Sequence, residues 1–164
     1  MLTQDDVAKM SVEDKLGRLA QAPDRLAAAI AGQPEAILVR RPDAKNWAPK
    51  EVVCHLRDTE ELFMGRFQTI LGMDEPKLVT AGDADRWAEE RQYLRNDAPE
   101  ALRAFRKRRE ESLTVIRGLA PDQWQRGGMH PARGRMTVGD FVSLMVWHDE
   151  NHLEQLARAL RGEP

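Results

Sequence analysis

The sequence predicts an all-α fold, a four-helix bundle with a long loop between its second and third long helices. Four long segments repeat apolar residues every three to four positions, the spacing that places side chains on one face of a helix. Capping residues, glycine or proline bound these segments, and no stretch of any length alternates polar and apolar residues as a strand would. With 164 residues, the chain is expected to form one domain over residues 1–164.

The first half of the chain is expected to hold two of the long helices. The first begins at Ser11, where Asp14 completes a capping pattern, and continues to Gly32. Pro23 lies inside it and is expected to kink or restart the helix, because proline lacks a backbone N–H. The second begins at Pro49, a residue suited to a first helical turn, and runs to about Leu71.

The second half is expected to hold the other two long helices. One begins at the capping residue Asp97 and ends near Gly118, and the last runs from Thr137 to about Leu160. Loops are expected at residues 73–83 and 126–136. A short helical piece is expected at residues 84–93, directly after the first loop.

The composition argues against several classes of protein. The 25 basic and 27 acidic residues nearly cancel, which argues against a dedicated nucleic-acid binder. No apolar run approaches the ~20 residues of a membrane span, and the acidic N-terminus does not resemble a signal peptide. The single cysteine, Cys54, excludes an intramolecular disulfide and is typical of a reducing compartment. A cytoplasmic protein without nucleic-acid or membrane partners is therefore expected.

Two histidines occupy the apolar face of the last predicted helix. His148 and His152 are spaced i, i+4, so both imidazoles lie on the same side and can share one metal ion. His55 lies at the edge of the apolar face of the second helix. If that edge faces the last helix, a third imidazole joins the pair. Three protein ligands, with a position left for water or substrate, are typical of a catalytic metal site.

The spacing alone leaves a plainer interpretation open, in which these are buried histidines with hydrogen-bond partners and no metal. The segment His148–His152 also resembles the HExxH motif of zinc proteases, but Asp149 replaces the glutamate, which disfavours a protease. Cys54 is interpreted as a small buried residue, and His130 as a surface or pocket-edge residue.

In order along nearly the whole chain, several motifs resemble the DinB-like superfamily, which includes bacillithiol and mycothiol transferases. The matching segments are Trp47–Glu51 leading into His55–Asp58, then Glu61, Phe63 and Arg66, then Phe105 with Arg109, Gly134–Thr137 and His148–Leu156. One departure is Ala48, where a Ser or Thr cap is common.

The resemblance implies a bundle in which His55, His148 and His152 bind one divalent metal ion, often zinc or nickel. It also implies a small-molecule substrate, and a homodimer is common among relatives. The metal could bind a low-molecular-weight thiol for transfer to an electrophile, or activate water for hydrolysis. A non-enzymatic binding or stress-response module, with the metal as a structural clamp, is the alternative.

Four further residues are candidates for the chemistry of such a site. Asp58 and Asp149 could orient the ligand imidazoles or accept a proton. Arg66 and Arg109 could hold an anionic substrate, although pairing at the protein surface is the expected role of each. The basic stretch Arg106–Arg109 is accordingly interpreted as a solvated helix face.

Overall fold

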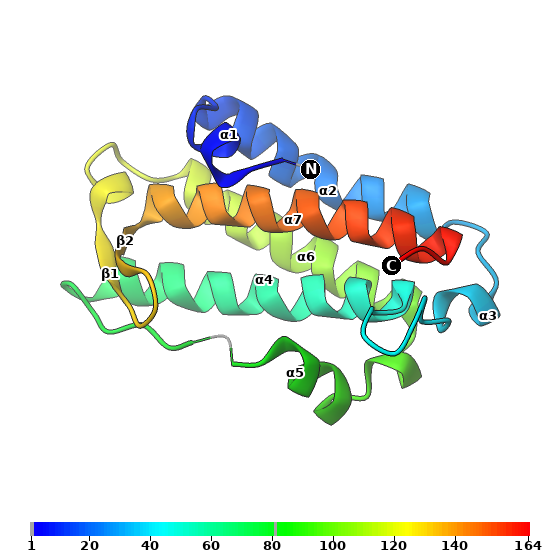
Figure 1. Cartoon of the computed structure of the whole chain (residues 1–164). Helices are drawn as coiled ribbons and strands as arrows, with labels where there is room; N and C mark the ends of the chain where they lie inside the picture. Colours follow the sequence, from blue (N-terminus) through cyan, green and yellow to red (C-terminus); the bar gives the residue numbers. More distant parts are fainter. Residues whose placement is uncertain (1, 81) are drawn as a thin grey trace.

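The computed structural model describes residues 2–80 and 82–164. Four long helices lie side by side in it and confirm the predicted all-α bundle (Figure 1). Their bounds are α2 (Val12–Ile30), α4 (Pro49–Gly72), α6 (Ala98–Arg117) and α7 (Val138–Arg161). Within the described ranges, no helix is both long enough and apolar enough to cross a membrane.

Short elements connect the long helices or lie against them. Before α4 these are α1 (Gln4–Ala8) and α3 (Glu35–Leu38), and after it α5 (Ala84–Glu90) with the 3-10 turns η1 (Tyr93–Arg95) and η2 (Gln123–Gln125). The expected helical piece at 84–93 is thus α5, which lies outside the bundle beside α4 (Figure 1).

The long connection between α4 and α6 follows from the direction of these helices. Both run toward the same end of the bundle (Figure 1), so the chain must return along their length before α6 can begin. A helix of 24 residues, such as α4, is about 36 Å long. The predicted loop at 73–83, together with α5 and η1, makes this return.

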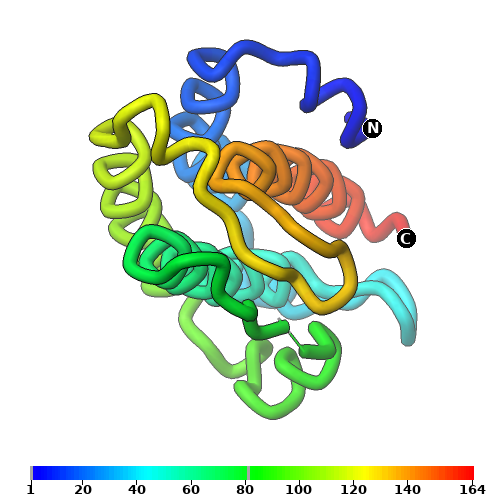
Figure 2. Tube along the Cα trace, turned by 90° about the vertical axis from the view of Figure 1, so that its left-hand side faces the viewer, coloured from blue at the N-terminus to red at the C-terminus, as the bar shows by residue number. Residues whose placement is uncertain are grey.

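The prediction of a loop at 126–136 is wrong, because the segment contains an antiparallel hairpin. Strand β1 (Gly127–His130) pairs with β2 (Gly134–Thr137), and the hairpin lies across one end of the bundle (Figure 2). It also holds the return segment, since Met129 N–H donates to the Pro76 carbonyl at 2.8 Å. A Cβ on Gly128 would lie 2.8 Å from that same carbonyl oxygen, so this close approach requires glycine.

Pro23 does not restart the first helix as expected, because α2 continues through it. Proline at position 23 cannot donate to the carbonyl of Leu19, four residues earlier. That carbonyl instead accepts a hydrogen bond of 2.9 Å from Nη1 of Arg109 on α6. The helix therefore tolerates the proline because a neighbouring helix supplies the missing donor.

The apolar core forms two clusters separated by a polar layer. Phe63 on α4 and Leu113 on α6 belong to one cluster, and Leu56 and Phe105 on the same helices belong to the other. Between them lie buried polar side chains from three helices, namely Glu60, Arg109 and Asp149. The three histidines lie at the level of this layer along α4 and α7.

Candidate metal centre

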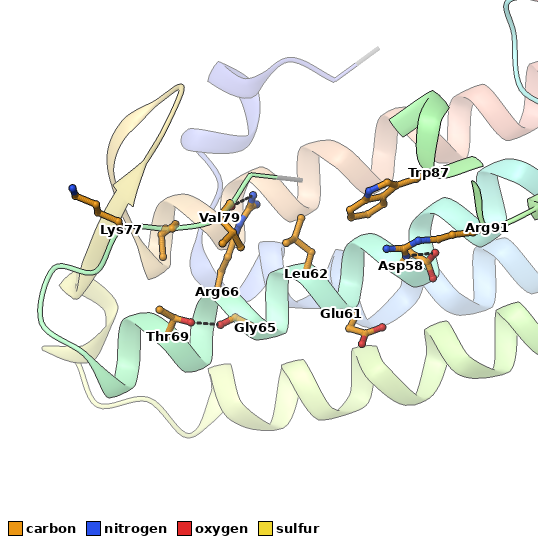
Figure 3. A pocket seen from close by; sticks show the side chains of 11 residues that line it. Asp58, Glu61, Leu62, Gly65, Arg66, Thr69, Lys77, Val79, Trp87 and Arg91 are labelled. Atoms are coloured by element: carbon orange, nitrogen blue, oxygen red, sulfur yellow. Dashed lines mark hydrogen bonds and ion pairs between the residues drawn. The ribbon is translucent and has the colours of Figure 1, made fainter. Parts of the chain in front are cut away.

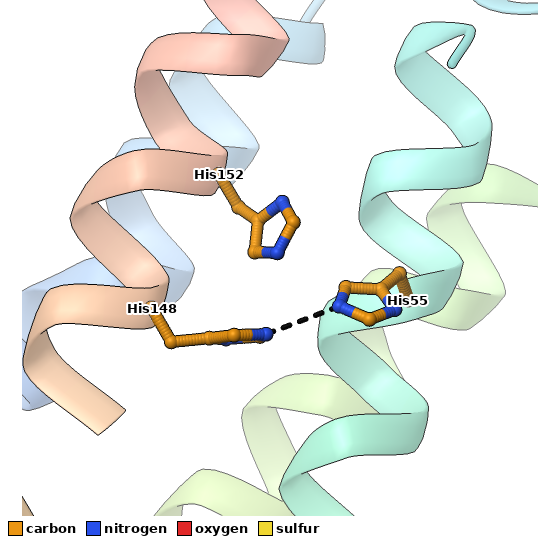
Figure 4. A group of neighbouring side chains, drawn as sticks. All are labelled: His55, His148 and His152. Atoms are coloured by element: carbon orange, nitrogen blue, oxygen red, sulfur yellow. Dashed lines mark hydrogen bonds between the residues drawn. The ribbon is translucent and has the colours of Figure 1, made fainter. Parts of the chain in front are cut away.

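The structure brings the three predicted histidines together between α4 and α7 (Figure 4). Nε2 of His55 lies 3.0 Å from Nε2 of His148. One ligand nitrogen from each of the three residues, including His152, lies within 4.8 Å of the other two. The condition left open by the sequence is met, because the edge of α4 that carries His55 faces α7.

Aromatic side chains from other segments border this cluster. The indole of Trp47, which precedes α4, lies with its centroid 4.8 Å from His55 and stacks on His152 at 6.1 Å. Its Nε1–H donates to Asp85 on α5 at 2.7 Å, which fixes the ring. The edge of Phe63 meets His148 with centroids 6.0 Å apart. These rings exclude water from two sides of the imidazoles.

Two of the imidazoles are held in the neutral form. Burial, with the nearby His152 and His148, lowers the pKa of His55 to about 2. Burial and the proximity of His148 likewise lower the pKa of His152 to about 3. A neutral imidazole is the form that binds metal, since a protonated ring has no free lone pair.

The hydrogen bond between His152 and Gln155 selects which nitrogen of His152 faces the cluster. Nδ1 of His152 lies 2.7 Å from Oε1 of Gln155, one helical turn further along α7. An amide oxygen only accepts, so Nδ1–H is the donor and the lone pair is on Nε2. Gln155 is thus the kind of outer partner that fixes the orientation of a metal ligand.

The donor set fits a divalent ion of the zinc type. Metal–nitrogen bonds of about 2.0–2.1 Å in tetrahedral geometry place ligand nitrogens about 3.3 Å apart. The spacings here, from 3.0 Å for His55 to His148 up to the 4.8 Å limit, bracket that value. Three imidazoles also suit nickel, copper and iron, so the donor set does not select the metal.

Next to the histidines, Arg109 joins all four long helices. Its Nη1 donates to Asp149 Oδ2 on α7 at 2.6 Å and to the Leu19 carbonyl on α2, and its Nη2 donates to Glu60 Oε2 on α4 at 2.6 Å. Arg109 is 1% exposed, so the expectation of surface pairing is wrong for it. Both carboxylates bind its guanidinium, which is buried and therefore not available to a substrate.

Asp149, a predicted orienting residue, lies beside His148. Its Oδ1 is 3.9 Å from Nδ1 of His148, slightly beyond hydrogen-bond distance, and its Oδ2 is bonded to Arg109. Burial raises the pKa of this carboxyl, but the charge and hydrogen bond of Arg109, together with the nearby His148, outweigh burial and leave the pKa lowered. Asp149 is therefore a carboxylate that pairs with Arg109 and lies close to His148 without a hydrogen bond to it.

The structure does not bring Asp58 to the histidines. Its Oδ1 accepts from Arg57 at 2.7 Å, and its Oδ2 accepts from Arg91 at 2.6 Å and from the hydroxyl of Tyr93 at 2.8 Å. Burial raises the pKa of this carboxyl, but these three donors outweigh burial and leave the pKa lowered. Its contacts tie α4 to α5 and η1, and they do not support the expected role in orienting a ligand imidazole.

Of the three remaining candidates, Cys54 and Arg66 are buried in the protein interior and His130 lies half-buried at the end of a strand. Cys54 is fully buried, and burial raises the pKa of its thiol to about 11, which agrees with a packing residue and not a nucleophile. His130 is half-buried at the end of β1 and accepts from Ala132 N–H at 3.2 Å. Arg66 is 5% exposed, so the expectation of surface pairing is wrong for it as well.

Two residues of the site were not singled out from the sequence. Glu60 lies four residues after Leu56 and three before Phe63, on the apolar face of α4, which is the signal that it is buried. Gln155 lies three residues after His152, a spacing at which helical side chains meet. A lone Glu or Gln in a helix is typical of the surface, so each residue is recognised as part of the site only together with its partner, Arg109 for Glu60 and His152 for Gln155.

Comparison with known proteins gives a consistent family and fold. Residues 18–156 match the family model described as the DinB superfamily. The structure of YfiT from Bacillus subtilis, described as "a probable metal-dependent hydrolase with an unusual four-helix bundle topology", superposes with a TM-score of 0.85. That likeness covers 93% of this chain and 89% of YfiT at 24% identity, and it shows the shared fold.

Two relatives in sequence have similar descriptions. "Putative metal-dependent hydrolase BH0277" of Halalkalibacterium halodurans is 22% identical over 157 residues, which cover 94% of this chain and 90% of that protein. "Putative metal-dependent hydrolase OB0782" of Oceanobacillus iheyensis is 24% identical over 115 residues. This second match spans 67% of this chain and 63% of the relative, less than two thirds of its length.

Proposed function

The chain belongs to the DinB superfamily, and on this basis we propose that His55, His148 and His152 hold one divalent metal ion in a hydrolase of small molecules. The observation that carries this proposal is the convergence of three imidazoles from α4 and α7, with two pKa values low enough to keep the rings neutral. The relatives described as metal-dependent hydrolases support water over a thiol as the nucleophile.

A divalent ion held by these three imidazoles would leave a coordination position open for water and would lower the pKa of that water toward about 7. The chain's own residues provide the rest of the site. Gln155 orients the imidazole of His152, Asp149 lies beside that of His148, and Trp47 and Phe63 exclude bulk water. Zinc and nickel are the ions we expect. The predicted thiol substrate, homodimer and cytoplasmic location stay predictions.

Hydrolysis should depend on added metal and on all three histidines. We expect protein loaded with zinc or nickel to cleave members of a panel of small esters, amides and phosphoesters, and chelated protein to lose that activity. His152→Ala should be inactive at any metal concentration. Gln155→Leu should remain active but need about 10–100-fold more metal for half activation, because the imidazole loses its orienting acceptor.

The matched control for Gln155→Leu is Gln155→Glu, which keeps an acceptor for Nδ1–H and should have a metal requirement close to that of the wild type.

The same assay separates catalysis from a structural role for the metal. Fully loaded protein that is folded but inactive across the panel would contradict the hydrolase and favour a metal clamp between α4 and α7.

A further inference from the structure

Arg66 is a buried cation with no carboxylate partner in the described part of the chain. It is 5% exposed, its Nη2 donates to the Val79 carbonyl at 3.2 Å, and its Nε has no hydrogen-bond partner among residues 2–80 and 82–164. The other deeply buried arginine, Arg109, binds two carboxylates. Buried arginines are almost always paired with an anion. The missing partner of Arg66 therefore points to an anion supplied from outside the chain.

The surroundings compensate the charge of Arg66 only in part. Its guanidinium carbon lies 5.7 Å from the ring centre of Phe63 and 5.4 Å from that of Phe141, so two π-faces contact it. Burial and the nearby charge of Arg133 lower its pKa, which shows that the site disfavours an unpaired cation. An anion bound here would offset both effects.

Arg66 lines a cavity of about 440 Å³ between α4, the return segment and α5 (Figure 3). That volume lies in the range of sites for small molecules. Leu62, Leu78 and Trp87 give the cavity apolar walls, whereas the exposed side chain of Lys77 points away from Arg66 (Figure 3).

The two acidic residues of the cavity do not neutralise Arg66. Asp58 binds Arg91 at 2.6 Å, and Glu61 binds Arg108 at 2.8 Å. The cavity thus combines an unpaired cation with apolar surface, the two features that an organic anion requires.

The position of Arg66 relates this cavity to the histidine cluster. Phe63 contacts both the guanidinium of Arg66 and, through its edge, the imidazole of His148. The two sites are therefore neighbours, joined through a single side chain of α4.

We propose that this cavity binds a small organic anion, whose carboxylate or phosphate group bonds to Arg66 while its apolar part lies against Leu62 and Trp87. This anion is the charged end of the substrate of the histidine centre, a step that rests on the proposed function. The anion site itself uses no metal ligand, so it can be tested without metal.

The test uses metal-free full-length protein titrated with phenylacetate, phenyl phosphate and uncharged phenylacetamide, followed by calorimetry or backbone amide shifts. At least one anion should bind with saturation, and phenylacetamide should bind about tenfold more weakly or worse. Arg66→Gln should weaken anion binding about tenfold or more, whereas Arg103→Gln, at an exposed position of α6, should not change it.

Two further measurements guard against a variant that fails only by unfolding. Arg66→Gln should melt at the wild-type temperature or above it, because it removes an unpaired buried charge. Leu62→Trp, which fills the cavity and keeps Arg66, should also abolish anion binding. The inference is overturned if neither anion saturates the wild type or if Arg66→Gln binds as tightly. A wild-type protein that binds anions but no metal would overturn the proposed function and leave the anion site at Arg66 in place.

Discussion

Replacing Arg109 with leucine is expected to lower the free energy of unfolding by about 3–5 kcal/mol, the cost of breaking a buried ion pair. The substitution leaves the carboxylates of Glu60 and Asp149 buried without their cation, and the Leu19 carbonyl without a donor. Urea unfolding of metal-free protein, followed by circular dichroism, measures the change.

Arg106→Leu is the matched control for this prediction. Arg106 lies on the same helix, half-exposed, and pairs with Asp24 at the surface, so its loss should cost less than about 1 kcal/mol. Pro23→Ala should recover more stability in the Arg109→Leu background than in the wild type, because an alanine at this position restores a backbone N–H for the Leu19 carbonyl. Equal losses for the two leucine variants would contradict the role given to the polar layer.

Lowering the pH below 6.5 should destabilise the metal-free protein steeply. In the folded state His55 and His152 stay neutral down to pKa values of about 2 and 3, because of burial and their proximity to neighbouring imidazoles. In the unfolded chain each histidine takes up a proton near pH 6.5. The unfolded state therefore binds more protons below that pH, so stability is fully present above pH 6.5 and is lost as pH falls.

The expected loss approaches about 1.4 kcal/mol per pH unit for each of the two histidines, which gives about 3 kcal/mol for the pair between pH 6.5 and pH 5. Urea unfolding of chelated protein at several pH values measures this slope. His55→Leu and His152→Leu should each remove about half of this slope. His130→Gln, at a half-buried position of the hairpin, should keep most of the slope. A flat profile in the wild type would show that the imidazoles are not held neutral.

The long helices could be predicted because each carries its own periodic signal and caps. The hairpin could not, because β1 and β2 have only four residues each and include three glycines, so neither strand shows alternation. It is held by contacts with the return segment, which the local sequence does not reveal. The expected restart of the helix at Pro23 was wrong for the same reason, because the donor to the Leu19 carbonyl comes from α6, a helix distant in sequence.

The histidine cluster was predictable because two histidines occupy the apolar face of the last helix and the third lies at the edge of the apolar face of α4. The polar layer was harder, because Arg109 ends a basic run that looks like a solvated face. A signal was nonetheless present. Arg109 lies four residues after Phe105 and four before Leu113, in the middle of the apolar face of α6. Helical spacing would therefore have predicted the burial of Arg109, whereas the charge of its neighbours led to the wrong expectation of a solvated face.

The most direct test of the metal centre is elemental analysis of untagged full-length protein, with wild type, His55→Ala, His148→Ala and His130→Ala purified in parallel. The centre proposed here predicts close to one divalent ion per chain in the wild type and in His130→Ala, and almost none in the other two variants. A wild type that carries no metal and takes up neither zinc nor nickel would contradict it, as would His55→Ala and His148→Ala proteins that retain the ion.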